Sequence, residues 1–424
     1  MTLLFLIYLF LLIVRPHEYV SWLVGVPIPR YVLLLSFLAW LLQRGKSLRA
    51  PQYILVPLVV IAAAISRIAM GWLGGVIQVF DFFLPALILF LVAARVTEEP
   101  KQLERVFRLI TLCALVLVAH GIDQVYTDGV GWTGQSTELK FEPPRIQYIG
   151  VFGDANDLGM LFVGCIPLCA YLAGRSRWPA KAFWYVSLCM LFFGIYLTRS
   201  RGTFVAILVV SALWVARRYG RVVGIVLSAI LIPLAVGSTR LGTISTEEES
   251  AAGRIDAWFE GLQMFEASPI FGVGYQMFGD FHERTAHNSW ILVLAELGIV
   301  GYLPWFMATG LSLYMLWVIG SHVRSSEQAG EVAETGEALD ARLADALLLS
   351  TLGMLVAAFF LTRSYELLMF LMWAWSAGHY TGALRRTPDL PPVTLATSGP
   401  KWAFLALCSI AGLYIMVRVL LVVL

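Results

Sequence analysis

Arginine residues are the clearest candidates for chemistry in this sequence. Twenty-five of the 30 basic residues are arginines and five are lysines. A guanidinium group can bind two phosphate oxygens at once, and it keeps its charge when it is partly removed from water. The excess of arginine therefore favours a site that binds phosphate or pyrophosphate. The alternative is that each arginine contacts lipid headgroups at a membrane surface.

Four arginines are the leading candidates for such a site. Arg199 and Arg201 lie in the segment TRSRG, which we expect to form a short corner between two helices. A corner this short keeps a guanidinium group close to the backbone that carries it. Arg145 and Arg254 lie in two long loops that we expect on the same side as this corner. Together these arginines could hold a phosphate group on which negative charge develops.

A histidine and a glutamate in the segment HNSWILVLAELGIVGY form the second candidate. Asn288 or Ser289 is expected to cap a helix, which places His287 at the helix N-terminus. Anionic groups favour that end of a helix, and imidazole can exchange a proton near neutral pH. Glu296 lies within the apolar part of the same helix and needs a partner or water. A purely structural cap with one polar contact remains the alternative.

Two aspartates in the segment GVFGDANDLG are the third candidate. Asp154 and Asp157 have the spacing of a helix-capping motif just before an apolar run. The simpler interpretation is therefore that they begin a helix. The other interpretation makes one of them, and Asp154 first, a general base or a contact to an acceptor sugar.

Two further polar clusters are less specific. Asp280, His282, Glu283 and His287 are possible metal ligands, but their spacing is not a standard zinc motif, and we expect no metal site. Arg363 and Glu366, in the segment TRSYE, are expected to form an ion pair at another helix corner.

The composition indicates which elements must carry these residues. Hydrophobic residues make up 59% of the chain and charged residues 14%, with a mean hydropathy of +0.78. Soluble proteins have about 45–50% apolar and about 25% charged residues, so this is expected to be a multi-pass membrane protein. A net charge of +2 gives no reason to expect a nucleic-acid partner.

The hydropathy pattern predicts an all-α bundle with 12 to 13 transmembrane helices. Thirteen apolar runs approach the length of about 20 residues that crosses a bilayer. They are Thr2–Val14, Tyr31–Leu42, Tyr53–Met70, Trp72–Ala94, Val106–Gly121, Leu158–Gly174, Phe183–Leu197, Thr203–Ala216, Val222–Val236, Ile299–Ile319, Ala344–Leu361, Leu367–Leu384 and Trp402–Leu424. With the N-terminus in the cytoplasm, 18 of the 30 basic residues fall in inner loops, as the positive-inside rule requires.

The same pattern divides the chain into segments. We expect N-terminal membrane helices over residues 1–121, an outer loop over 122–157, central membrane helices over 158–236, a large outer loop over 237–298, and C-terminal membrane helices over 299–424 with a cytoplasmic linker at 320–343. In the large loop, apolar residues from Ile255 to Phe265 recur at helical spacing. This spacing predicts an amphipathic helix on the outer leaflet.

Three segments together resemble the bacterial O-antigen ligase/polymerase superfamily: GVFGDANDLG, TRSRG, and the stretch from GRIDAWFEG to HNSWILVLAELGIVGY. The specific resemblance covers residues 150 to about 320. Its members are similar to all-helical membrane glycosyltransferases of the GT-C type. The resemblance implies transfer of a glycan from undecaprenyl pyrophosphate to a hydroxyl of a glycan or lipid A-core acceptor. It also implies a bacterial inner-membrane location, an active site and outer loops that face the periplasm, and no cofactor.

The resemblance carries over to individual residues. The family's loop arginines correspond to Arg199 and Arg201, its outer-loop arginine to Arg254, and its outer-loop histidine to His287. The chain departs from the polymerase pattern because its outer loops lack an R-x10-G repeat. It also has an additional C-terminal span, Trp402–Leu424. Whether the chain is of the ligase or the polymerase subtype therefore stays open.

Residues and resemblance together predict an inverting, metal-independent glycosyltransferase. The arginines would hold the donor pyrophosphate while an acceptor hydroxyl attacks the anomeric carbon. His287 would polarise the pyrophosphate or act as the base, with Asp154 and Glu296 as competing bases. The alternative function is a transporter or flippase for lipid-linked oligosaccharide or polysaccharide. The gathering of polar residues at one membrane face favours the enzyme over the transporter.

Overall fold

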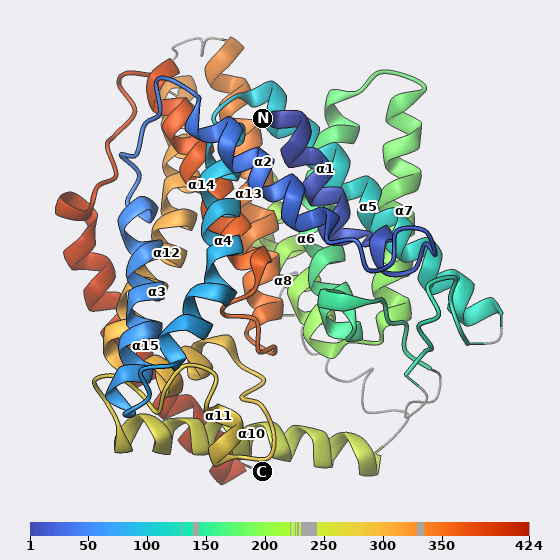
Figure 1. Cartoon of the computed structure of the whole chain (residues 1–424). Coiled ribbons are helices and arrows are strands. Elements are labelled where there is room, and N and C mark those ends of the chain that lie inside the picture. Colours follow the sequence, from blue (N-terminus) through green and yellow to red (C-terminus); the bar gives the residue numbers. More distant parts are fainter. Residues whose placement is uncertain are drawn as a thin grey trace. The chain divides into compact units, whose positions relative to one another are not determined.

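The computed structural model is all-α, as the hydropathy pattern predicts (Figure 1). It describes residues 1–127, 129–138, 144–220, 222–224, 226, 229, 244–328 and 335–423. Within these residues two isolated β-bridges occur and there is no strand.

Nine helices of the described residues are long and apolar enough to cross a membrane. They are α3 (Gln52–Ala69), α4 (Gly75–Thr97), α5 (Pro100–Tyr126), α6 (Ala155–Arg175), α7 (Ala180–Thr198), α8 (Arg201–Tyr219), α12 (Ser289–Gln328), α13 (Thr335–Ala358) and α15 (Leu395–Val423). The chain is therefore a multi-pass membrane protein.

Three further helices coincide with expected spans. The helices α1 (Thr2–Ile13) and α2 (Ile28–Leu41) are apolar but shorter, and α14 covers Leu367–Arg386. Twelve of the thirteen predicted spans thus correspond to helices of the described residues. The remaining one, Val222–Val236, lies largely outside the described residues, as does much of the expected cytoplasmic linker.

The chain divides into two compact units, which we describe separately. Unit 1 consists of Met1–Arg44, Val96–Thr239 and Ile319–Ala357. Unit 2 consists of Gly45–Arg95, Arg240–Val318 and Ala358–Leu424. The helix α12 therefore belongs to unit 2 from Ser289 to Val318 and to unit 1 from Ile319 onward.

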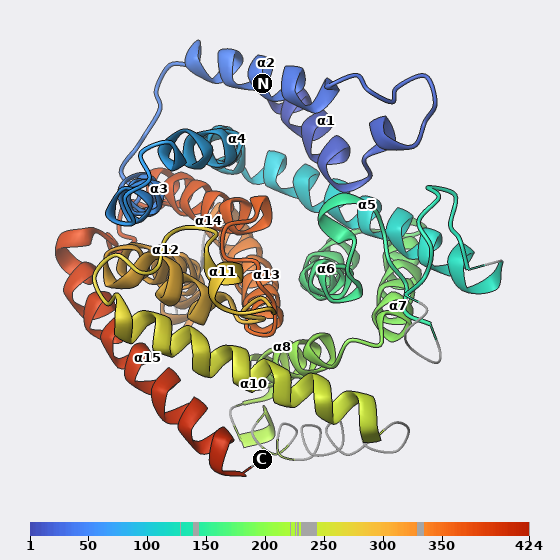
Figure 2. The same ribbon diagram turned by 60° about the horizontal axis from the view of Figure 1, so that its bottom comes forward.

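Unit 1 is built around α6, which contacts α5, α7 and α8 (Figure 2). Most of α6 is buried, because its neighbours cover it on several sides. The segment between α5 and α6 folds back over the unit. Tyr148, in this segment, is fully buried, and its hydroxyl donates a hydrogen bond of 2.6 Å to the carbonyl of Val14. This contact anchors the segment beside the end of α1.

Unit 2 contains α3, α4, α14, α15 and the first part of α12. The helix α10 (Ile244–Ala267) runs across the ends of α3 and α12 and contacts α15 (Figure 1). Its apolar side chains Trp258 and Leu262 are buried, and the Trp258 ring lies 5.9 Å from that of Phe359. The amphipathic helix predicted here is present, but these two residues of its apolar face pack against protein rather than lipid.

Candidate functional site

The corner that carries Arg199 and Arg201 has the form that its sequence predicts. Arg199 ends α7 in the left-handed conformation, with φ of 50°, and its guanidinium lies 3.9 Å from the centre of the Tyr196 ring. The side chain of Ser200 caps α8 by accepting a hydrogen bond of 3.2 Å from the Thr203 amide. Arg201 follows as the first residue of α8 and is exposed. The backbone therefore fixes where both arginine side chains begin.

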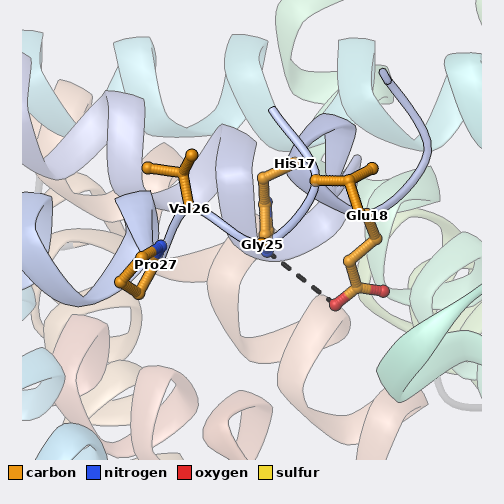
Figure 3. A pocket seen from close by; sticks show the side chains of 6 residues that line it. His17, Glu18, Gly25, Val26 and Pro27 are labelled. Atoms are coloured by element: carbon orange, nitrogen blue, oxygen red, sulfur yellow. Dashed lines mark ion pairs between the residues drawn. The ribbon is translucent and has the colours of Figure 1, made fainter. Parts of the chain in front are cut away.

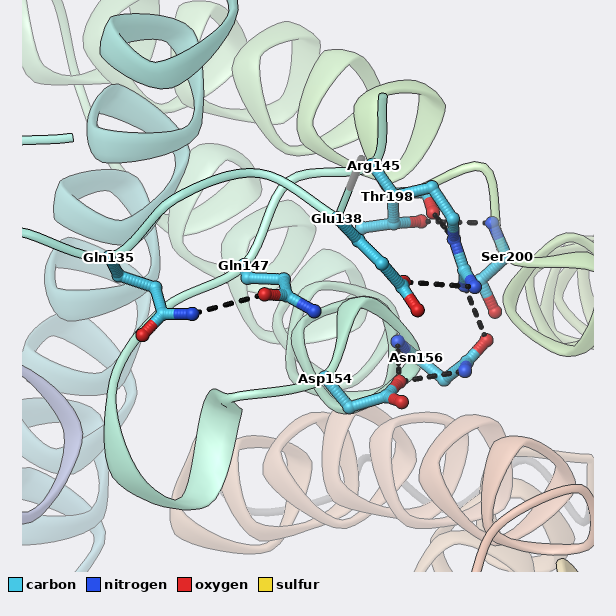
Figure 4. Close-up of polar contacts among 8 residues, drawn as sticks. All are labelled: Gln135, Glu138, Arg145, Gln147, Asp154, Asn156, Thr198 and Ser200. Carbon is cyan, nitrogen blue, oxygen red and sulfur yellow. Dashed lines mark hydrogen bonds and ion pairs between the residues drawn. The ribbon is translucent and has the colours of Figure 1, made fainter. Parts of the chain in front are cut away.

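Arg145 lies beside this corner but is buried, with only 8% of its surface exposed (Figure 4). Its Nε donates a hydrogen bond of 2.9 Å to the Thr198 carbonyl, and its Nη2 donates one of 2.9 Å to Oδ1 of Asn156. Its Nη1 lies 3.6 Å from Oε2 of Glu138. The guanidinium thus joins the loop after α5 to the arginine corner, which is a different environment from the one expected for a phosphate ligand.

Asp154 is the N-cap of α6, so the capping interpretation is confirmed. Its Oδ1 accepts hydrogen bonds of 2.6 Å from the Asn156 backbone amide and 2.7 Å from the Asn156 side chain. Asn156 in turn accepts from Arg145, so Asp154, Asn156 and Arg145 form one polar chain beside the corner (Figure 4). Asn156 was not a sequence-based candidate, although it stands between the two aspartates of the motif.

In unit 2, Asn288 caps the start of α12. The sequence predicted either Asn288 or Ser289 as this cap. Its Oδ1 accepts hydrogen bonds of 2.9 Å from the Trp290 amide and 3.1 Å from the Ile291 amide. His287 therefore precedes the first turn of the helix, in the left-handed conformation with φ of 46°. A histidine held at positive φ is uncommon and indicates that its surroundings fix it there.

A corner between α13 and α14 holds this helix start. The His287 amide donates a hydrogen bond of 3.0 Å to the Thr362 hydroxyl. The Ser289 hydroxyl donates to the Leu361 carbonyl at 2.7 Å, and the Ser364 hydroxyl donates to the Ser289 carbonyl at 2.7 Å. Thr362 and Ser364 were not predicted as site residues. The signal was available, because the tetrapeptide LTRS occurs at both residues 197–200 and 361–364.

A break in α12 positions Glu296. Gly298 has non-helical angles, φ of 57° and ψ of −160°, and interrupts the helix nine residues after its start at Ser289. The segment before α12 fills the break, because the Val273 and Gly274 amides donate to the carbonyls of Ala295 and Glu296 at 2.9 and 3.0 Å. A Cβ atom at Gly298 would lie 2.5 Å from the Ile270 carbonyl oxygen, so only glycine fits.

Glu296 is 3% exposed, and its Oε1 accepts a hydrogen bond of 3.3 Å from the Phe278 amide. Its Oε2 and the Tyr365 hydroxyl lie near each other but outside hydrogen-bond geometry, and neither has a partner among the described residues. Burial and the neighbouring carboxyl raise the pKa of Tyr275 and of Tyr365 above the ordinary phenol value. Both phenols therefore stay protonated and can donate hydrogen bonds.

Arg254 is half-buried on α10. Beside it, the Arg284 guanidinium covers Gly253, and Asp256 forms an ion pair of 3.2 Å with Nε2 of His282. His282 is thus occupied by a carboxylate of α10. Among the described residues, no three histidine, cysteine, aspartate or glutamate side chains gather as metal ligands.

Two pockets are candidate binding sites. One, of about 340 Å³, lies in the connection between α1 and α2 and is lined by His17, Glu18 and residues 24–27 (Figure 3). His17 and Glu18 are its only ionisable lining residues, with Nε2 of His17 3.8 Å from Oε1 of Glu18. The remaining lining residues are a glycine, a proline and two valines. The other, of about 310 Å³, lies in unit 2 and includes Glu296. The second pocket has more polar side chains in its lining, which favours it as the substrate-binding site.

The candidate residues therefore form two sets. In unit 1, Asp154 and Arg145 are linked by hydrogen bonds through Asn156, and Arg145 is bonded to the residue that precedes Arg199. In unit 2, His287 and Glu296 border one short helical segment before the break, and Arg254 lies on α10.

Comparison with known proteins gives one family match. Residues 185–306 match the model of the O-antigen ligase family, and no curated protein matches the chain. The matched segment includes Arg199, Arg201, Arg254, His287 and Glu296, and it supports a membrane glycosyltransferase of the O-antigen ligase type. Over these residues, the predicted resemblance of the chain to the O-antigen ligase/polymerase superfamily is confirmed.

Proposed function

We propose that the protein is an inverting glycosyltransferase of the bacterial inner membrane whose active site faces the periplasm. Its donor is a glycan on undecaprenyl pyrophosphate, and its acceptor is a hydroxyl of a second glycan or of a lipid A-core. The observation that carries the proposal is the family match over residues 185–306. This segment contains both the arginine corner and the fixed start of α12 at His287.

The reaction is a single displacement. The acceptor oxygen forms a bond to the anomeric carbon while the bond from that carbon to the pyrophosphate oxygen breaks. The electron pair of the broken bond leaves with the pyrophosphate, and the acceptor proton passes to a base. Attack opposite the leaving group inverts the configuration at the anomeric carbon.

We assign Arg199, Arg201 and Arg254 to the pyrophosphate. Charge-assisted hydrogen bonds to phosphate strengthen as negative charge develops on the leaving group, which lowers the barrier. These cations replace the positive charge that a divalent metal supplies elsewhere, so the proposed reaction is metal-independent. Arg145 acts as a positioning residue, because its guanidinium contacts Thr198, Asn156 and Glu138 and the bond to Thr198 holds the corner.

His287 is the proposed base. The cap at Asn288 and the hydrogen bond to Thr362 hold its backbone in one conformation, and imidazole accepts protons near neutral pH. Asp154 fits this role less well, because its Oδ1 already accepts two hydrogen bonds as a helix cap. Glu296 has one unpartnered oxygen in a pocket and is better suited to binding substrate.

Deleting the gene tests the function. If the protein is an enzyme of this type, the deletion strain should accumulate lipid-linked glycan on the periplasmic side, and its surface glycan should be lost or shortened. Single repeat units on the surface indicate a missing polymerase, and intact polymer left on its lipid carrier indicates a missing ligase. Accumulation of the lipid-linked glycan on the cytoplasmic side would contradict an enzyme and indicate a flippase. Complementation with the wild-type gene must restore the original surface glycan.

A further inference from the structure

The pocket in unit 2 is built from four separate segments of the chain. Phe82 comes from α4, Phe278 and Gly279 from α11 (Phe278–Phe281), Glu296 from α12, and Tyr365 from the corner between α13 and α14. Its volume of about 310 Å³ is at the lower end of the range for ligand pockets. A pocket this size accommodates one small ring rather than a long chain.

Two buried polar groups of this pocket lack partners. Oε2 of Glu296 and the Tyr365 hydroxyl make no hydrogen bond within the described residues, although these side chains belong to residues that are 3% and 7% exposed. A buried oxygen without a partner is costly, so such groups are usually satisfied by a ligand or water. The carboxylate accepts and the phenol donates, which together match the hydroxyl groups of a sugar.

The remaining lining supplies an apolar face. Phe82 and Phe278 present aromatic carbon to the pocket alongside Leu292. A pyranose ring has hydroxyls at its edge and C–H groups on its faces, so it combines an apolar contact with edge hydrogen bonds. Pockets that orient small ligands have this combination of apolar walls and a few placed polar groups.

The charges of the pocket disfavour an anion. It contains the carboxyls of Glu296 and Glu366 and one cation, Arg363, whose Nη1 lies 3.3 Å from Oε1 of Glu366. The ion pair expected from the TRSYE segment is therefore confirmed, and in it Glu366 neutralises Arg363. The pocket has no net positive charge whichever protonation state Glu296 has. A phosphate or an acidic sugar would meet carboxyls that have no spare cation.

The pocket adjoins the proposed base. Thr362 and Thr285 line it, and the Thr362 hydroxyl both accepts from the His287 amide and lies 3.2 Å from the Thr285 hydroxyl. We propose that this pocket binds one neutral sugar ring of the glycan substrate, with Glu296 and Tyr365 bonded to its hydroxyls. The proposal rests on the proposed function for the identity of the glycan.

Gly279 allows the pocket to be filled selectively. A Cβ atom there would meet no other atom within 4 Å, and its backbone does not have positive φ, so Gly279→Phe adds a large ring to the pocket lining without backbone strain. Gly412 on α15 also has open space and lies outside the pocket, so Gly412→Phe is the matched control. Glu296→Gln is the second test variant, because it keeps an oxygen for the Phe278 amide and removes the carboxylate.

The experiment measures binding to the full-length protein in detergent. The probe is the oligosaccharide released by mild acid from the lipid-linked glycan of the source cells, titrated by calorimetry. Wild type and Gly412→Phe should bind equally, Gly279→Phe should bind at least about tenfold more weakly, and Glu296→Gln about tenfold more weakly. No binding by wild type, or equal binding by wild type and both pocket variants, would overturn the proposal.

A transfer assay on the same preparations separates this proposal from the proposed function. If wild type binds the oligosaccharide through the pocket but forms no glycosidic bond from a lipid-linked donor, the function is wrong and the pocket stands. If wild type and Gly279→Phe transfer glycan equally, the function stands and the pocket assignment is wrong.

Discussion

Arg199 and Arg201 have different surroundings although one residue separates them. Arg199 is half-buried over the Tyr196 ring, whereas Arg201 is exposed at the start of α8. Both begin from backbone that the Ser200 cap fixes. A planar guanidinium in such a position can engage two phosphate oxygens, while a lysine offers a point charge with a larger hydration shell.

The difference between a planar guanidinium and a lysine ammonium predicts the effect of lysine at the corner. Charge-assisted hydrogen bonds contribute about 1.5–3 kcal/mol each, so losing one should slow transfer roughly ten- to a hundredfold. Arg201→Lys and Arg199→Lys should therefore be nearly as damaging as the alanine variants. Initial rates with lipid-linked donor measure this, with Arg218→Lys at the other end of α8 as the control. If both lysine variants kept most of the activity and both alanine variants lost it, the positive charge alone would suffice for transfer.

Asp154 allows a cap to be separated from a base. Asparagine caps helices about as well as aspartate, but it cannot accept a proton at neutral pH. Asp154→Asn should therefore retain transfer within about threefold, whereas Asp154→Ala should lose about 1 kcal/mol of stability. Transfer rates and thermal unfolding in detergent measure the two effects. An inactive but stably folded Asp154→Asn would restore Asp154 as a candidate base.

Some features of these residues follow from local sequence and others do not. The caps at Asp154 and Asn288 depend on neighbours within three positions, so the sequence indicates them directly. The role of Arg145 depends on Thr198, 53 positions away, on Glu138 in the loop after α5, and on Asn156 in the first turn of α6. Such burial arises only when distant segments meet, and a single sequence does not encode that meeting in any local pattern.

The break in α12 is the main feature at the scale of elements. Its apolar run reads as a continuous span, and the expected span begins at Ile299, just after the break. The helix begins at Ser289, as the predicted cap at Asn288 or Ser289 requires, and the segment 269–274 is inserted at Gly298, which the sequence did not predict. Gln276 and Phe278, which line the pocket of Glu296, closely follow this inserted segment, and the Phe278 amide bonds to the Glu296 carboxyl.

Gly298 should therefore not tolerate a side chain. Gly298→Ala combines a positive φ of 57° with a contact of 2.5 Å to the Ile270 carbonyl oxygen, so it should cost at least about 2 kcal/mol. Thermal unfolding in detergent would show a lower midpoint than wild type. Gly412→Ala, in an unobstructed helix position, should leave the midpoint unchanged or raise it slightly. Equal midpoints for the two variants would mean that the break relaxes without cost.

At the scale of the whole molecule, hydropathy was a sufficient guide to the fold class. Twelve predicted spans correspond to helices because a bilayer-spanning segment must be long, apolar and hydrogen-bonded within itself. The packing of these helices did not follow from hydropathy. Lipid and protein interior are both apolar, so the pattern cannot show which face of α10 or α15 meets protein.

The two units each carry part of the proposed machinery. The corner arginines belong to unit 1, and His287, Glu296 and Arg254 belong to unit 2. Substitutions in either unit should therefore impair the same reaction if the proposed function is right. If variants of one unit lost donor binding while variants of the other unit kept full transfer, the two sets of residues would have different tasks.

The most direct measurement uses purified protein reconstituted with lipid-linked donor and acceptor in EDTA. Wild type should form the glycosidic bond and release undecaprenyl pyrophosphate at the same rate with and without the chelator. His287→Ala should lose at least about a hundredfold in rate while remaining folded, because general base catalysis contributes about 10²–10⁴-fold. His282→Ala, five residues earlier, should stay active. A His287→Ala rate within threefold of wild type, or a wild-type rate that requires an added metal, would contradict the account.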